Sequence, residues 1–293
     1  MKSKRRWIIV VVLLLTAACI VGIVWYINSN FQSQDHSRQK EERQKTESPQ
    51  TSQNQELSIW ILGDSLAAHS RSSNSEGWGE GLQNYLKDET VVVRNVAMGG
   101  ASSSSFIQSG SYKMVIEELQ KGDYVIIQFG INDAWYKDRS TNPFTSSKIP
   151  GSFKNILKED YIKPILKKGG HVILSTSVMQ PAAMFYQQQE QEEVFYTPHV
   201  QAVRELVDEC KKEKLDVLLL DTHAITQTLY HEMGMNEAYG FHVEDGIHYN
   251  NYGAFYVAGL IAEELKKLGL PCCQEIRTIE EVMAAQSFKQ PEH

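Results

Sequence analysis

The alternation of apolar runs with amphipathic stretches is the feature that most constrains how this chain can fold. Between residues 57 and 268, short apolar runs with the length of strands alternate with segments whose apolar residues recur at helical spacing. Strands that alternate with helices form a parallel sheet with helices packed on its faces. We therefore predict an α/β fold, a three-layer α/β/α sandwich with a central five-stranded parallel sheet. The predicted strands are Leu57–Leu62, Val91–Ala97, Tyr124–Phe129, His171–Ser177 and Asp216–Leu220.

The helices between the strands are predicted from apolar residues that repeat every three or four positions. A continuous pattern of this length suits one domain with its own core, so residues 57–293 are assigned to a single α/β domain. The predicted helices are Gly77–Leu86, Tyr112–Leu119, Ile156–Lys168, Pro198–Lys214 and Asn251–Leu268.

The first 27 residues form a separate segment. Two lysines and two arginines among the first six residues precede an uncharged apolar run from Trp7 to Ile27. At about 1.5 Å per residue this run would span roughly 30 Å, the thickness of the hydrocarbon core of a bilayer. Basic residues before the run and few after it predict a cytoplasmic amino terminus and an exported remainder. We therefore predict a transmembrane anchor or uncleaved signal over residues 1–27, with the membrane as a partner.

Two alternatives for this segment stay open. A cleaved signal peptide would need a shorter apolar region followed by small residues at the cleavage site, and Ala17 and Ala18 are small. A lipoprotein signal would use Cys19, although the run stays apolar beyond that cysteine. The domain would then be secreted or lipid-anchored.

A polar linker follows the apolar segment. Residues 28–56 are rich in Gln, Ser, Glu and Lys, with almost no apolar residue after Phe31. Such a composition cannot bury enough apolar surface to offset the entropy of ordering the chain. We predict that residues 28–56 are a disordered tether.

The charge balance bears on the partners of the exported part. The whole chain has 29 basic and 36 acidic residues, and four of the basic residues lie before Trp7. The remainder is therefore strongly acidic, which excludes nucleic acid as an expected partner. No group of Cys and His residues has the spacing of a zinc site, so we predict neither a metal nor an organic cofactor.

Polar residues with the chemistry of nucleophilic catalysis occur directly after predicted strands. Ser65 follows the first strand within Gly63-Asp64-Ser65, and Asn132 follows the third. The carboxyl ends of parallel strands share one edge of the sheet, where α/β folds bind their ligands. Asp245 and His248 are three residues apart, close enough for the carboxylate to face one ring nitrogen while the other faces a serine hydroxyl.

These motifs resemble those of the SGNH, or GDSL-type, hydrolases, and the resemblance runs from Leu57 to Leu270. It is most specific for the rhamnogalacturonan acetylesterase group of that superfamily. The matching segments are Gly63-Asp-Ser-Leu-Ala67, Gly77-Trp-Gly79, Asn95-Val-Ala-Met-Gly-Gly100, Gly130-Ile-Asn-Asp133, Asp221-Thr-His223 and Asp245-Gly-Ile-His-Tyr-Asn250.

The resemblance implies a flavodoxin-like fold and a serine esterase that removes O-acetyl groups from a carbohydrate. It assigns Ser65 as the nucleophile, His248 as the general base and Asp245 as the group that orients the imidazole. The amides of Ser65 and Gly100 and the side chain of Asn132 would form the oxyanion hole. The expected substrate is an acetylated polysaccharide of the pectin or rhamnogalacturonan type, or another acetylated polysaccharide.

Residues near these motifs are predicted to contact the substrate. Aromatic faces and mixed polar side chains suit a sugar ring. The predicted contacts are Asp64, His69, Arg71, Trp135, Tyr136 and Tyr249.

Three other functions are compatible with the same sequence. An O-acetyltransferase would use the same residues to pass the acyl group to a glycan hydroxyl at the cell surface. A lysophospholipase or thioesterase would prefer longer acyl chains. A surface-binding module without catalysis would carry the motifs but leave the serine unreactive.

Overall fold

The computed structural model describes residues 56–135, 147–181, 195–286 and 288. The chain divides into two units at Gln55, and only the second, residues 56–293, contains described residues. The predicted anchor over residues 1–27 lies outside the described residues, as does the predicted linker apart from its last residue, Glu56. Within the described ranges, no helix has the length and apolar character that crossing a membrane requires.

A five-stranded parallel sheet forms the centre of the domain, as predicted. The strands are β1 (Leu57–Gly63), β2 (Val91–Asn95), β3 (Tyr124–Gln128), β4 (His171–Ser175) and β5 (Val217–Leu220). Their order across the sheet is β2-β1-β3-β4-β5, and each neighbouring pair is parallel. The chain moves from β1 to β2 on one side and then returns to β3 on the other, which opens a crevice at the carboxyl end of β1.

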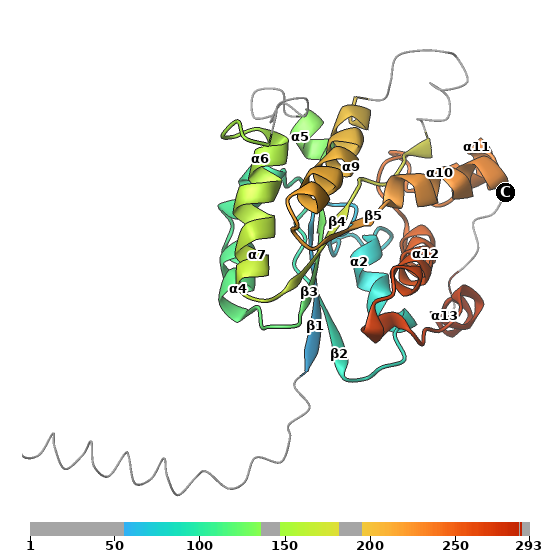
Figure 1. Ribbon diagram of the computed structural model, residues 1–293. Coiled ribbons are helices and arrows are strands. Elements are labelled where there is room, and N and C mark those ends of the chain that lie inside the picture. The colour runs from blue at the N-terminus through green and yellow to red at the C-terminus, as the bar shows by residue number, and fades with distance from the viewer. Residues whose placement is uncertain (1–55, 136–146, 182–194, 287, 289–293) are drawn as a thin grey trace, which may run out of the picture. The chain divides into compact units, whose positions relative to one another are not determined.

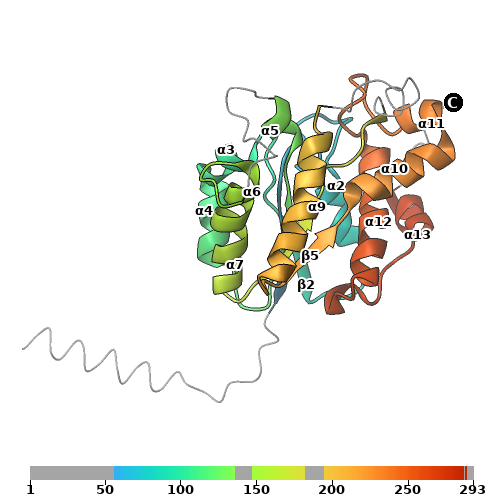
Figure 2. The same cartoon turned by 45° about the horizontal axis from the view of Figure 1, so that its top comes forward.

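Helices cover both faces of the sheet, which confirms the three-layer prediction (Figures 1 and 2). One layer contains α2 (Trp78–Gly81), η1 (Leu82–Tyr85), α12 (Asn251–Lys267) and α13 (Ile279–Gln286). The other contains α3 (Ser103–Ile107), α4 (Gly110–Glu118), α6 (Phe153–Ile156), η2 (Leu157–Ile162), α7 (Lys163–Lys167) and α9 (Thr197–Lys212).

Alternating side chains of β1 build the two cores. Ile59 and Ile61 pack under α2 and α12, whereas Trp60 and Leu62 pack under the opposite layer. All four are nearly inaccessible to solvent, with exposed fractions of 2% or less. Because β1 is buried on both faces, its position is fixed, and so is the turn that leaves its carboxyl end.

Several helices were not predicted from the sequence. They are α3, α5 (Ile131–Trp135), α10 (Thr222–Met233), α11 (Met235–Tyr239), η3 (Pro271–Cys273) and α13. Most are too short to show a full apolar repeat. The longest, α10, begins at a cap that the sequence does show, since the Asp221 side chain accepts a hydrogen bond from the Ala224 amide.

Candidate active site

Ser65 lies in a tight turn directly after β1. The Asp64 carbonyl accepts hydrogen bonds from the amides of Ala67 (3.2 Å) and Ala68 (3.0 Å), and the Asp64 side chain accepts one from the Leu66 amide (3.0 Å). The turn also packs against Gly77, where an added Cβ would lie 2.3 Å from the Ala67 carbonyl carbon. These contacts fix the backbone on both sides of Ser65.

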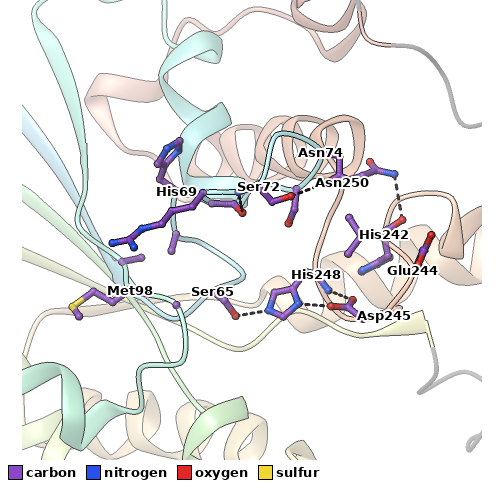
Figure 3. Close-up of a pocket in the computed structure, with 17 residues that line it drawn as sticks. Ser65, His69, Ser72, Asn74, Met98, His242, Glu244, Asp245, His248 and Asn250 are labelled. Carbon is purple, nitrogen blue, oxygen red and sulfur yellow. Dashed lines mark hydrogen bonds and ion pairs between the residues drawn. The ribbon is translucent and has the colours of Figure 1, made fainter.

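His248 connects Ser65 to Asp245. Its Nε2 lies 2.9 Å from the Ser65 Oγ, and its Nδ1 lies 2.7 Å from the Asp245 Oδ2 (Figure 3). A carboxylate only accepts, so Nδ1 carries the hydrogen and Nε2 is free to accept the serine proton. The structure thus brings together the three residues that the sequence predicts as nucleophile, base and orienting carboxylate.

The Asp245 carboxylate is held in its ionised form. Burial raises its pKa, but the hydrogen bonds that it accepts outweigh this effect and lower the pKa below its ordinary value. They come from the His248 ring and from the backbone amides of Ile247 (2.8 Å) and His248 (2.9 Å). A fixed anion beside His248 stabilises the imidazolium that forms when the ring accepts a proton.

The predicted oxyanion donors come from the turn after β1, the loop after β2 and the short helix α5. The loop after β2 is tied to β1 by the Met98 amide, which donates to the Gly63 carbonyl (2.9 Å). Gly100, further along this loop, has φ +74°, a conformation that favours glycine. The Asn132 side chain donates to the Ala101 carbonyl (3.1 Å), which places it beside this loop with a second N–H to offer.

Asp133 joins the loop that carries Gly100 to α5, the helix that carries Asn132. It is fully buried, and it accepts hydrogen bonds from the Ser103 amide (3.0 Å) and the Ser103 hydroxyl (2.5 Å). The start of α3 is thereby attached to α5. Sequence reasoning gave Asp133 no role, although its place next to Asn132 in the same motif was a usable signal.

A polar cleft of about 1120 Å³ opens beside Ser65. In Figure 3, Met98 and His69 lie toward the Ser65 end, and Glu244 lies toward the Asp245 end. The cleft is much larger than an acetyl group, and hydroxyl and amide side chains make up much of its wall. Its lining residues are Ser65, Ala68, His69, Ser70, Arg71, Ser72, Asn74, Ser75, Ala97, Met98, Gly99, His242, Val243, Glu244, Asp245, His248 and Asn250.

Only some of the predicted substrate contacts line the cleft. His69 and Arg71 line the cleft, and the His69 Nδ1 lies 3.1 Å from the Glu76 Oε2. Asp64 and Tyr249 are buried, with exposed fractions of 1% and 0%, and neither lines the cleft, which argues against their prediction as substrate contacts.

The two remaining predicted contacts are not part of this cleft wall. Trp135 is 63% exposed, and its ring lies edge-on to Phe195 with 5.4 Å between the ring centroids. Its contact with substrate stays a prediction, and Tyr136 lies outside the described residues. Within the described ranges, no group of three or more His, Cys, Asp and Glu residues could bind a metal ion.

The fold and this site define a class of protein. Residues 59–261 match the model of the GDSL-like lipase/acylhydrolase family, and the chain belongs to that family. It is 31% identical to the rhamnogalacturonan acetylesterase RhgT of Bacillus subtilis, over 73% of this chain and 92% of that protein. It is 27% identical to the rhamnogalacturonan acetylesterase of Emericella nidulans, over 68% of this chain and 81% of that protein.

A solved structure supports the same assignment. The crystal structure of YxiM from Bacillus subtilis superposes with a TM-score of 0.62 at 26% identity. The match covers 73% of this chain and 57% of the YxiM chain, so this chain spans little more than half the length of that protein.

Proposed function

We propose that this protein is a carbohydrate O-acetylesterase that works through an acyl-enzyme on Ser65. The observation that carries the proposal is the hydrogen-bonded series Asp245–His248–Ser65 at the wall of a polar cleft. Its membership of the acylhydrolase family and the names of its relatives support an ester of a carbohydrate as the substrate.

The reaction follows from the geometry in two halves. The Ser65 Oγ attacks the acetyl carbonyl carbon while its proton moves to the His248 Nε2, and the sugar oxygen leaves with that proton. A water molecule then attacks the acetyl-serine, gives a proton to His248, and releases acetate as the Ser65 hydroxyl is restored. In both halves, the amides of Ser65 and Gly100 and the Asn132 side chain stabilise the negative oxygen.

For the substrate, we propose an acetylated polysaccharide that contains acidic sugars, of the rhamnogalacturonan type. Two relatives carry that substrate in their names. Arg71 is the only Arg or Lys among the residues that line the described cleft, and within the described part of the chain its guanidinium makes no hydrogen bond or ion pair. Its guanidinium is therefore available to a carboxylate next to the acetylated sugar.

Acetate release from a panel of acetylated polysaccharides tests the proposal. The panel contains rhamnogalacturonan, xylan, mannan and peptidoglycan. We expect acetate to appear without any added acceptor, and fastest from rhamnogalacturonan. Acetate transfer that depends strictly on an acceptor hydroxyl would instead make the protein an acetyltransferase. A preference for long acyl chains on nitrophenyl esters would make it a lipid or thioester hydrolase.

The location of the protein is proposed from residues 1–27 alone. Their uncharged apolar run would anchor the chain in the cell membrane, with the esterase domain outside the cytoplasm. The full-length protein should stay with membranes in high salt and come off only in detergent, because salt does not screen apolar burial. A mature chain that begins near Ala17 or Cys19 would instead indicate signal cleavage or lipidation.

A further inference from the structure

A buried cluster of three aromatic side chains lies behind the turn that carries Asp245 and His248. His242 is 6% exposed, and Tyr230 and Tyr249 are fully buried. The His242 Nε2 lies 2.8 Å from the Tyr230 hydroxyl on α10. The His242 ring also packs on Tyr249, with 4.7 Å between centroids and 32° between the planes. The imidazole is therefore fixed in place by neighbours on two sides.

The hydrogen bonds determine which nitrogen of His242 carries the hydrogen. The Nδ1 lies 3.1 Å from the backbone carbonyl of Ile247, and a carbonyl only accepts, so Nδ1–H is the donor. The Nε2 then accepts from the Tyr230 hydroxyl. Burial lowers the pKa of His242 to about 4, so the ring is neutral near pH 7 and retains this tautomer. Although His242 forms part of the cleft wall, both ring nitrogens are already engaged.

The peptide group between Ile247 and His248 connects His242 to the Asp245 carboxylate. Its carbonyl, that of Ile247, accepts from His242, while its N–H, that of His248, donates to the Asp245 Oδ1 at 2.9 Å. The other carboxyl oxygen of Asp245 faces the His248 ring. A rotation of the peptide between Ile247 and His248 would therefore turn the carboxylate away from the His248 ring. The neighbouring contact between the Val243 amide and the His248 carbonyl (2.9 Å) closes the turn from the other side.

We propose that His242 is a positioning residue for the esterase reaction: by fixing the Ile247 carbonyl, it orients the Asp245 carboxylate toward His248. The proposal rests on the proposed function, because it assigns Asp245 and His248 their roles in catalysis. It differs from ordinary core packing in one respect. A histidine that only fills space affects stability, whereas a positioning histidine affects the protonation of the base and the rate of the chemical step.

Two substitutions separate the two hydrogen bonds of His242. In His242→Asn the amide nitrogen takes the place of Nδ1 and can still donate to the Ile247 carbonyl. In His242→Gln the amide group takes the place of Nε2 and reaches Tyr230 instead. Both are polar, uncharged and smaller than or similar to histidine. The comparison therefore shows whether activity depends on the contact with the Ile247 carbonyl or on the contact with Tyr230, and not only whether it depends on the imidazole ring.

The experiment uses the full chain in detergent with p-nitrophenyl acetate as the probe ester. For His242→Gln we expect kcat to fall about tenfold with KM within about twofold, since one oriented hydrogen bond is lost at a step after binding. The acid limb of its kcat–pH profile should move to lower pH, because a misaligned carboxylate stabilises the imidazolium less. His242→Asn should keep most of the wild-type kcat and the wild-type acid limb.

Two further variants complete the design. His223→Asn changes another buried histidine, at the start of the helix that carries Tyr230, and should leave kcat and the acid limb unchanged. Tyr230→Phe removes the hydroxyl that donates to Nε2 but leaves the Nδ1 contact in place, so, like His242→Asn, it should keep most of the wild-type kcat and the wild-type acid limb. If His242→Gln does not fold, as judged by its thermal transition, His242→Leu, which also lacks a donor to the Ile247 carbonyl, tests the inference in its place.

The outcomes distinguish this inference from the proposed function. A wild-type acid limb and kcat in His242→Gln or, if that variant does not fold, in His242→Leu would overturn the positioning role. So would equal losses in the Asn and Gln variants, or a loss confined to KM. A wild-type protein that hydrolyses no acetyl ester would overturn the proposed function itself, whatever the variants do.

Discussion

Asp64 should make the folded protein less stable as the pH rises. Its carboxyl is buried, and Oδ2 has no hydrogen-bond partner within the described part of the chain. Burial, reinforced by the nearby Asp133 carboxylate, raises the pKa of Asp64 from 3.8 to about 7, although the Leu66 amide and His248 act in the opposite direction. The folded state therefore binds this proton more tightly than the unfolded state does. The resulting stabilisation is complete below pH 3.8 and is lost as the pH rises through 7.

The size of the effect follows from the shift. Each pKa unit corresponds to about 1.4 kcal/mol, so a shift of about three units corresponds to about 4 kcal/mol of unfolding free energy. Asp64→Asn keeps an oxygen for the Leu66 amide but cannot ionise. The unfolding free energy of wild type minus that of the variant should therefore fall by about 4 kcal/mol between pH 4 and pH 8.

Urea unfolding of both proteins at several pH values measures this difference. The titration of all other groups cancels in the difference because both proteins contain those groups. Asp88→Asn is the control, because that carboxylate is exposed and the hydroxyl and amide of Thr90 lower its pKa. The unfolding free energy of wild type minus that of Asp88→Asn should therefore rise with pH. If the wild-type minus Asp64→Asn difference is flat from pH 4 to pH 8, Asp64 does not hold a proton in the folded state, and the reasoning from its burial fails.

Two further predictions concern the site. Asn132→Ala should lower kcat on the order of 10²–10³-fold with little change in KM, because an oxyanion donor acts in the transition state. Steady-state kinetics measures both constants, and a change mainly in KM would reassign Asn132 to substrate binding. Arg71→Gln should raise KM for acetylated rhamnogalacturonan while leaving KM for acetylated xylan unchanged, and the difference should shrink in high salt. Equal changes on both polymers would remove Arg71 from the recognition of acidic sugars.

Much of the fold could be predicted from the sequence because buried strands leave a pattern of apolar residues in it. Strands such as β1 and β3, buried on both faces, appear as continuous apolar runs, and their ends were predicted to within one or two residues. Short helices could not be found in this way. In α5, only five residues long, no apolar repeat develops, and its Asp133 is fully buried.

Part of the site could be predicted because its residues follow strands that the sequence shows. Ser65 and Asn132 follow neighbouring parallel strands, so the topology alone brings them to one edge of the sheet. Which way a side chain points is set by tertiary packing. Asp64 precedes the serine but turns into the core, and Tyr249 follows His248 but packs under the turn. The role of His242 depends on a contact with the Ile247 carbonyl that no sequence pattern marks.

Acetate release by the wild-type protein and by Ser65→Ala, without an acceptor, tests the central claim most directly. Acetylated rhamnogalacturonan is the substrate, and circular dichroism shows that both proteins are folded. We expect Ser65→Ala to lose at least about 10⁴-fold in kcat, and Ser65→Ala/His248→Ala to be little worse, because the two residues act as a unit. Retention of wild-type acetate release by folded Ser65→Ala would contradict an acyl-enzyme on Ser65 and the account built on it.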